Sequence, residues 1–228
     1  MTERLRLALP GGTPAELLAD HALLLPQTRA LVVADVHFGK AATFRARGVP
    51  VPQGTTTDNL RRLDTLLAAT GPGLLVFLGD LFHAREAHAP ATLAALRDWR
   101  ARHPHVDMVL VEGNHDRHAG APPADLGVRV VQEPWPLGTL ALCHHPQRVA
   151  GLHVLAGHLH PCVRLYGGAN DSLRLPCFWV REELTLLPAF GEFTGGAPIV
   201  REACDRVVAI GAGQLYEVPA PRPAVSAA

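Results

Sequence analysis

Ala30-Leu31-Val32-Val33-Ala34-Asp35-Val36-His37 is a short apolar run followed at once by an acid and a histidine. A run without polar residues is typical of a strand buried on both faces. Four more apolar runs are each followed by polar residues. These runs cover 74–78, 108–111, 139–142 and 153–156, and the residues that follow include Asp80, Asn114, His144 and His158. Because ligands bind beyond the carboxyl ends of strands in open α/β sheets, the pattern predicts an α/β fold with these side chains at one rim.

Other stretches indicate the elements around this rim. The leucine spacing in 58–67 predicts a helix, as does the spacing in 90–100, and 14–21 is expected to form a shorter helix. After residue 161 short strands are expected at 163–166, 173–180, 183–187 and 207–210, forming a second sheet that faces the first. We expect one domain over 1–218 and a flexible tail over 219–228, which is rich in proline and alanine.

The bulk composition narrows the class of protein. A chain of 228 residues, 48% of them hydrophobic, is long enough for one domain with a sizeable core. The formal net charge is zero, which argues against a protein held on DNA mainly by bulk charge but not against a local arginine groove. Four cysteines without a CxxC pair, no signal layout and no membrane-length apolar run predict a cytoplasmic protein with reduced thiols and no membrane contact.

The polar blocks have the composition of a two-metal site. Two divalent ions about 3.5–4 Å apart, bridged by a carboxylate, clamp the attacking and leaving oxygens of a phosphoryl displacement. Asp80 is the natural bridge, because the glycine before it lets the backbone turn tightly. Asp35 and His37 are two residues apart, as are His158 and the later His160, so each pair points to one side of an extended segment.

Taken in order, the motifs DxH (35–37), GD (79–80), GNHD (113–116), a histidine at 144 and GHxH (157–160) resemble those of the calcineurin-like metallophosphoesterases. The resemblance implies a two-sheet β-sandwich flanked by helices, a four-layer αββα arrangement, with two metal ions, most often Mn²⁺. Fe, Zn and Mg also accept subsets of these ligands.

The same resemblance implies a role for each matching residue. One metal would be held by Asp35, His37, Asp80 and His160, and the other by Asp80, Asn114, His144 and His158. A metal-bridging hydroxide would attack phosphorus, and His115 would act as general acid or stabilise the transition state. His144 is favoured over His145 as the ligand, and the reverse assignment stays open.

The connecting segments resemble a narrower group. Residues 35–45, 48–52, Gly54, 187–191 and 193–196 are similar to the bacterial ligase-associated DNA damage response endonucleases of the PdeM group. That similarity implies phosphodiester cleavage in DNA, a link to DNA repair, and partners such as a ligase or a helicase. One position departs from many relatives, which carry GDxxD where this chain has His83. The departure leaves open which carboxylate orients His115, with Asp116 as one candidate.

Substrate contacts are less defined by the sequence. Arg45 and Arg47 could clamp a phosphate bidentately, or they could be solvated loop arginines. Two alternatives to a DNA endonuclease are considered: a phosphodiesterase or phosphatase for cyclic nucleotides or other small nucleotides, and a scaffold that has lost catalysis. A scaffold should have broken ligands, whereas this chain keeps every position. The sequence does not indicate an oligomeric state.

Overall fold

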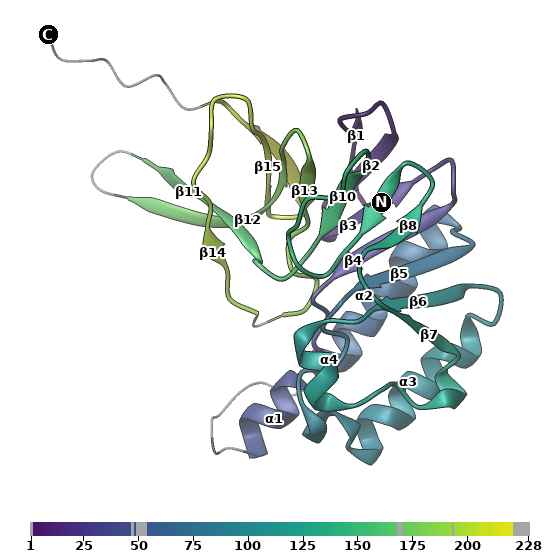
Figure 1. Ribbon diagram of the computed structural model, residues 1–228. Coiled ribbons are helices and arrows are strands. Elements are labelled where there is room, and N and C mark those ends of the chain that lie inside the picture. Colours follow the sequence, from purple (N-terminus) through teal and green to yellow (C-terminus); the bar gives the residue numbers. More distant parts are fainter. Residues whose placement is uncertain (1, 47, 49–53, 168–170, 193, 221–228) are drawn as a thin grey trace, which may run out of the picture.

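The computed structural model describes residues 2–46, 48, 54–167, 171–192 and 194–220. Two mixed β-sheets pack face to face, and the described helices flank this sandwich on the side of the first sheet, which confirms the predicted α/β two-sheet fold class (Figure 1). In the predicted tail, residues 221–228 lie outside the described part of the chain. No described helix is long and apolar enough to cross a membrane. All four cysteines are free thiols.

The first sheet has seven described strands in sequence order, antiparallel from β1 to β4 and parallel from β4 to β7. They are β1 (Arg4–Ala8), β2 (Pro14–Leu18), β3 (Ala22–Leu25), β4 (Ala30–Ala34), β5 (Leu74–Leu78), β6 (Asp107–Val111) and β7 (Val128–Val131). The helix expected over 14–21 is wrong, because this stretch forms β2 and a turn. Its residues Ala15 to Leu18 are all buried between β1 and β3, and a short apolar run of this kind does not distinguish helix from strand by periodicity.

The described helices all precede Gly127 and associate with the first sheet. They are α1 (Lys40–Ala46), α2 (Thr55–Thr70), η1 (Arg85–His88), α3 (Pro90–Arg102), α4 (Asn114–Ala119) and η2 (Ala124–Leu126). The helices predicted over 58–67 and 90–100 lie within α2 and α3. Leu63, Leu66 and Trp99 of these two helices bury their side chains in the same core cluster as Val33 and Phe77 of the sheet, so they cover its outer face.

The second sheet contains the remaining nine described strands. They are β8 (Trp135–Leu137), β9 (Leu140–Leu142), β10 (His153–Ala156), β11 (Pro161–Tyr166), β12 (Ser172–Val180), β13 (Leu184–Leu186), β14 (Ala197–Pro198), β15 (Arg206–Gly211) and β16 (Gln214–Val218). Loop side chains cover much of its outer face: Val149 and Leu152 pack on β10, and Ile199 packs near Val163 of β11. Between the sheets, Val32 and Val76 of the first share one core with the second.

The five predicted strands that end in polar residues do not all belong to one sheet, as the sequence pattern had suggested. They are divided between the two sheets. β4, β5 and β6 belong to the first sheet, and β9 and β10 belong to the second. The segment after β13 joins the two rims: the Leu187 amide donates to the Ala156 carbonyl at 2.9 Å, and the Phe190 amide donates to the Ala34 carbonyl at 2.8 Å. Because this segment binds the ends of β10 and β4, all five strand ends meet at one edge of the sandwich.

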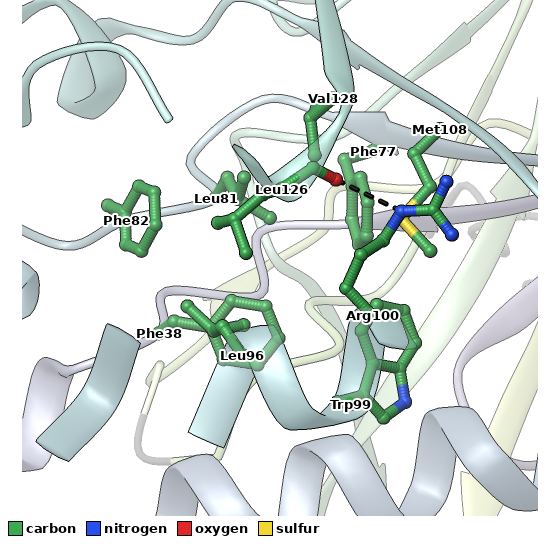
Figure 2. A pocket seen from close by; sticks show the side chains of 10 residues that line it. All are labelled: Phe38, Phe77, Leu81, Phe82, Leu96, Trp99, Arg100, Met108, Leu126 and Val128. Carbon is green, nitrogen blue, oxygen red and sulfur yellow. Dashed lines mark hydrogen bonds between the residues drawn. The ribbon is translucent and has the colours of Figure 1, made fainter. Parts of the chain in front are cut away.

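Aromatic residues anchor the two loops that leave β4 and β5. Phe38 and Phe82 form an isolated parallel bridge just after His37 and Asp80. Both side chains are buried and lie against Leu96 of α3 around a small apolar hollow of about 20 Å³ (Figure 2). The buried side chains of Phe38 and Phe82 therefore anchor, in the hydrophobic core, the loops that carry predicted site residues.

We expect Phe82→Ala to lower the free energy of unfolding by about 3–5 kcal/mol, because it empties a fully buried aromatic site beneath Asp80. Urea denaturation followed by circular dichroism measures the change. Val200→Ala is the control, since Val200 is 85% exposed, and it should shift stability by less than about 0.5 kcal/mol. Equal midpoints for Phe82→Ala and the wild type would contradict this account of the core.

Candidate metal centre

Five of the predicted metal ligands share an unusual backbone conformation. Positive φ angles occur at Asp35 (52°), His37 (49°), Asp80 (51°), His158 (68°) and His160 (47°). Such conformations cost on the order of 1–3 kcal/mol each in a non-glycine residue and cluster at functional sites. The prediction that Asp35 and His37, and likewise His158 and His160, lie on extended segments is therefore wrong. Their side chains converge because the chain turns at each of these residues after its strand has ended.

On one side of the rim, four predicted ligands approach one another. The Nε2 atom of His160 lies 3.4 Å from Oδ1 of Asp35, and Nε2 of His37 lies 3.8 Å from Oδ2 of Asp80. Asp35, His37 and His160 each offer a ligand atom within 4.8 Å of the other two. The structure thus brings together the side chains that the family resemblance assigns to the first metal.

On the other side, His144 is the central residue. Its Nε2 atom lies 2.9 Å from Oδ1 of Asn114, 3.5 Å from Oδ1 of Asp80 and 3.1 Å from Nδ1 of His158. His144 is fully buried, and it forms a second group of potential ligands with Asp35 and Asp80. All seven predicted metal ligands are thus brought together, with Asp80 between the two sides.

The contacts of His144 suit a cation at its Nε2 atom. Its Nδ1 donates to the Leu78 carbonyl at 3.0 Å, which places the ring proton on that nitrogen. Burial lowers the pKa of His144, so a second proton on Nε2 is disfavoured. The Nε2 lone pair then faces the oxygens of Asn114 and Asp80. Side-chain oxygens that converge on an imidazole lone pair are an arrangement that a metal ion completes.

The two carboxylates give the same indication. Oδ2 of Asp35 accepts a hydrogen bond from the His158 amide at 2.9 Å, whereas its buried Oδ1 has no hydrogen-bond partner among the described residues. Burial, together with the nearby Asp35, raises the pKa of Asp80. A bound cation would satisfy the first oxygen and stabilise the ionised form of the second carboxyl group.

His115 is oriented by the main chain. Its Nδ1 donates to the carbonyl of His83 at 2.9 Å, and its ring stacks on the His83 ring at 5.0 Å between centroids with 22° between planes. The amide of His115 donates to Oδ1 of Asp80 at 2.9 Å. Position 83, where many relatives carry an acid, therefore contributes a carbonyl and an imidazole ring, and no carboxylate contacts the His115 ring in the described residues.

Asp116, the proposed substitute for that acid, has a different task. Its Oδ2 accepts hydrogen bonds from the amides of Asp80 and Gly113, and its Oδ1 accepts from Leu81 and Phe82. It thus ties the loop after β5 to the start of α4. Burial raises the pKa of Asp116 to about 6, although these hydrogen bonds oppose the shift.

Glu133 is a positioning residue that the sequence did not indicate. Its Oε2 accepts from the amides of His144 and His145, at 2.7 and 2.9 Å. Its Oε1 lies 2.6 Å from Nδ1 of His145. The Glu133 carboxylate therefore fixes the orientation of the His145 ring, which packs against the rings of His144 and His158. This arrangement favours His144 as the ligand.

Two motif glycines are required by close approach to the carboxylates. A Cβ atom on Gly157 would overlap Oδ2 of Asp35, and one on Gly113 would overlap the Asp80 carboxylate and amide. The glycines of the GHxH and GNHD motifs thus allow neighbouring backbone to pack directly on the two acids.

The predicted phosphate contacts lie farther out. Arg45 is exposed on α1 and lines a hollow of about 200 Å³ together with the first turns of α2 and α3. Arg47 falls outside the described residues. Lys40 is the cation coupled to the carboxylates: burial lowers its pKa, and Asp35 and Asp80 oppose that shift.

Comparison with known proteins agrees with this geometry. Residues 28–158 match the family model described as calcineurin-like phosphoesterase. The chain belongs to this family. Its structure is similar to the crystal structure of Pseudomonas putida nuclease MPE, with 47% identity, a TM-score of 0.85, and coverage of 95% of this chain and 100% of that one. The E. coli phosphoesterase YfcE is 19% identical, with a TM-score of 0.41 and coverage of 84% and 99%. No curated protein sequence matched the chain.

These findings confirm the family resemblance stated from the motifs, and the nuclease neighbour is consistent with the narrower resemblance to the PdeM group. Because the family is that of phosphoesterases, the expected reaction class, hydrolysis of a phosphate ester, is supported.

We expect Asp116→Ala to destabilise the protein by about 3 kcal/mol or more, because four buried amides lose their acceptor at once. Urea unfolding measures the loss. Asp125→Ala removes an exposed carboxylate paired with Arg97 and should change little. Similar unfolding curves for the two variants would show that the Asp116 hydrogen bonds do not hold the loop.

Proposed function

We propose that the chain is a two-metal phosphodiesterase that cleaves nucleic acid, with DNA as its substrate. The observation that carries this proposal is the buried set of converging acceptors around His144, Asp35 and Asp80, which a pair of cations would complete. The Pseudomonas putida protein that shares 47% of its residues with this chain is described as a nuclease. That description supports a nucleic acid, rather than a phosphomonoester, as substrate.

The ligands are assigned as the family resemblance implies. Asp35, His37, Asp80 and His160 would hold one ion, and Asp80, Asn114, His144 and His158 the other. Two divalent cations in such a site stabilise charge on a phosphoryl centre and make water nucleophilic near neutral pH. Mn²⁺ is proposed as the native metal because the family resemblance implies it; Fe, Zn and Mg accept subsets of the same ligands.

His115 is proposed to handle the proton of the leaving group. Its hydrogen bond to the His83 carbonyl fixes one proton on Nδ1, which leaves Nε2 to exchange a proton with a substrate oxygen. Lys40, near both carboxylates, adds a positive charge that favours an anionic substrate. A role in DNA repair, with a ligase or helicase as partner, is proposed by resemblance.

We expect the metal-stripped protein to be inactive, and added Mn²⁺ to restore hydrolysis of bis-p-nitrophenyl phosphate and cleavage of DNA. Asp80→Asn should abolish both activities, because both ions lose a shared ligand. His115→Ala should lower the rate of DNA cleavage about 100-fold or more, as general acids typically contribute 10²–10⁴-fold. Initial rates at saturating Mn²⁺ test this.

His105→Ala is the matched control, because His105 is an exposed histidine outside the rim, and its rates should equal those of the wild type. Hydrolysis of the small diester without DNA cleavage would instead support a phosphodiesterase for small nucleotides. Two bound metals without either activity would support the scaffold alternative. DNA cleavage unchanged in Asp80→Asn would refute the two-metal assignment.

A further inference from the structure

β11 and β12 extend beyond the body of the second sheet as a two-stranded ribbon, defined here as residues 163–166 and 172–175 (Figure 1). In the described part of the chain, β14 pairs with β11 only at Pro161 and Cys162, and β15 pairs with β12 only from Cys177 onward. Isolated two-stranded ribbons are marginally stable in water. A projecting ribbon that carries exposed side chains is therefore a candidate binding element.

One face of the ribbon concentrates positive charge. Arg164 and Arg174 are direct cross-strand partners, and both are exposed. Like charges directly opposite one another destabilise a sheet. Among the described residues neither guanidinium forms an ion pair with a carboxylate; Arg174 donates only to the Gly196 carbonyl at 3.4 Å. Tyr166 lies on the same face by strand alternation and is 78% exposed.

The ribbon is joined to the metal centre by the first residues of β11. β11 begins directly after the predicted ligand His160, whose Nδ1 donates to the Thr194 carbonyl at 3.1 Å. Gly196, which accepts from Arg174, packs so closely on Cys162 and the His160 carbonyl that a Cβ atom there would overlap the thiol. At a strand rise of about 3.3 Å per residue, Arg164 lies about 13 Å from His160 along β11.

We propose that this ribbon face binds a single strand of nucleic acid whose scissile phosphate lies at the metal centre, an inference that rests on the proposed function. Arg164 and Arg174 would contact phosphates, because guanidinium groups bind them bidentately. Tyr166 would stack on a base, which every base permits. A bound phosphate chain would offset the repulsion between the Arg164 and Arg174 guanidinium groups. The ribbon would thus give a chain of zero net charge a local binding site for a polyanion.

The test uses the metal-stripped full chain, which is expected not to cleave DNA, and a fluorescent single-stranded DNA oligonucleotide. Binding is followed by anisotropy over a series of salt concentrations, and Mn²⁺ is restored only for the hydrolysis assays. The double variant Arg164→Ala/Arg174→Ala should lower the slope of log affinity against log salt by about 1.4, since each phosphate contact contributes about 0.7. Tyr166→Ala should weaken binding about fivefold or more. Hydrolysis of bis-p-nitrophenyl phosphate should be unchanged in both, because that substrate is too short to reach the ribbon.

The matched control is Arg148→Ala/Arg206→Ala, which removes the same charge elsewhere. Arg148 pairs with Glu183, and Arg206 lies opposite Val180, at the end of β12 farthest from the ribbon. This control should bind the oligonucleotide with the wild-type salt slope. A ribbon variant with wild-type DNA affinity, or one that loses small-diester hydrolysis equally, would overturn the inference. Binding does not need turnover, so a wild type that binds through the ribbon but cleaves nothing would refute only the proposed function.

Discussion

The rim of this sandwich depends on holding two carboxylates, Asp35 and Asp80, close together inside the protein. Burial and mutual repulsion both oppose two negative charges there, as the raised pKa of Asp80 shows. Main-chain amides partly compensate, because His158 donates to Asp35 and His115 donates to Asp80. These donors come from loops that also carry other predicted ligands. The same loops therefore position both the acids and the histidines. A bound cation would offset the remaining repulsion between the two carboxylates.

Holding that arrangement requires strained backbone, and the strain is balanced by contacts below it. Five predicted ligands have left-handed φ angles, a conformation that side chains normally avoid. The loops that contain them are anchored by the buried aromatic pair Phe38 and Phe82 and by the four amides that Asp116 accepts. The segment after β13 adds main-chain hydrogen bonds to the ends of β4 and β10. Strain that is surrounded by rigid packing keeps ligands preorganised, so little is reordered when a metal binds.

The sequence predicted which residues lie together at this rim better than it predicted the elements around them. Apolar runs that end in Asp35, Asp80 and Asn114 have one clear interpretation, because a buried strand and its polar end are both visible in the residue types. Residues 14–18 offered no such distinction, since a short apolar run fits a strand as well as a helix. The sequence also did not predict that these strands are divided between two sheets, because the pairing of strands depends on long-range packing. Glu133 was missed for the same reason: it acts on His144, eleven residues away, through backbone amides.

His83 illustrates a further limit of motif comparison and its chemical consequence. An acid at this position would orient His115 and stabilise its protonated form, but it would also place a negative charge beside an anionic phosphodiester. Here the orienting acceptor is the main-chain carbonyl of His83, which every residue possesses and no motif reveals. A carbonyl does not ionise, so it accepts the Nδ1 proton of His115 without adding charge. The chain thereby keeps His115 oriented without adding a negative charge that would repel the phosphate group of an ester substrate.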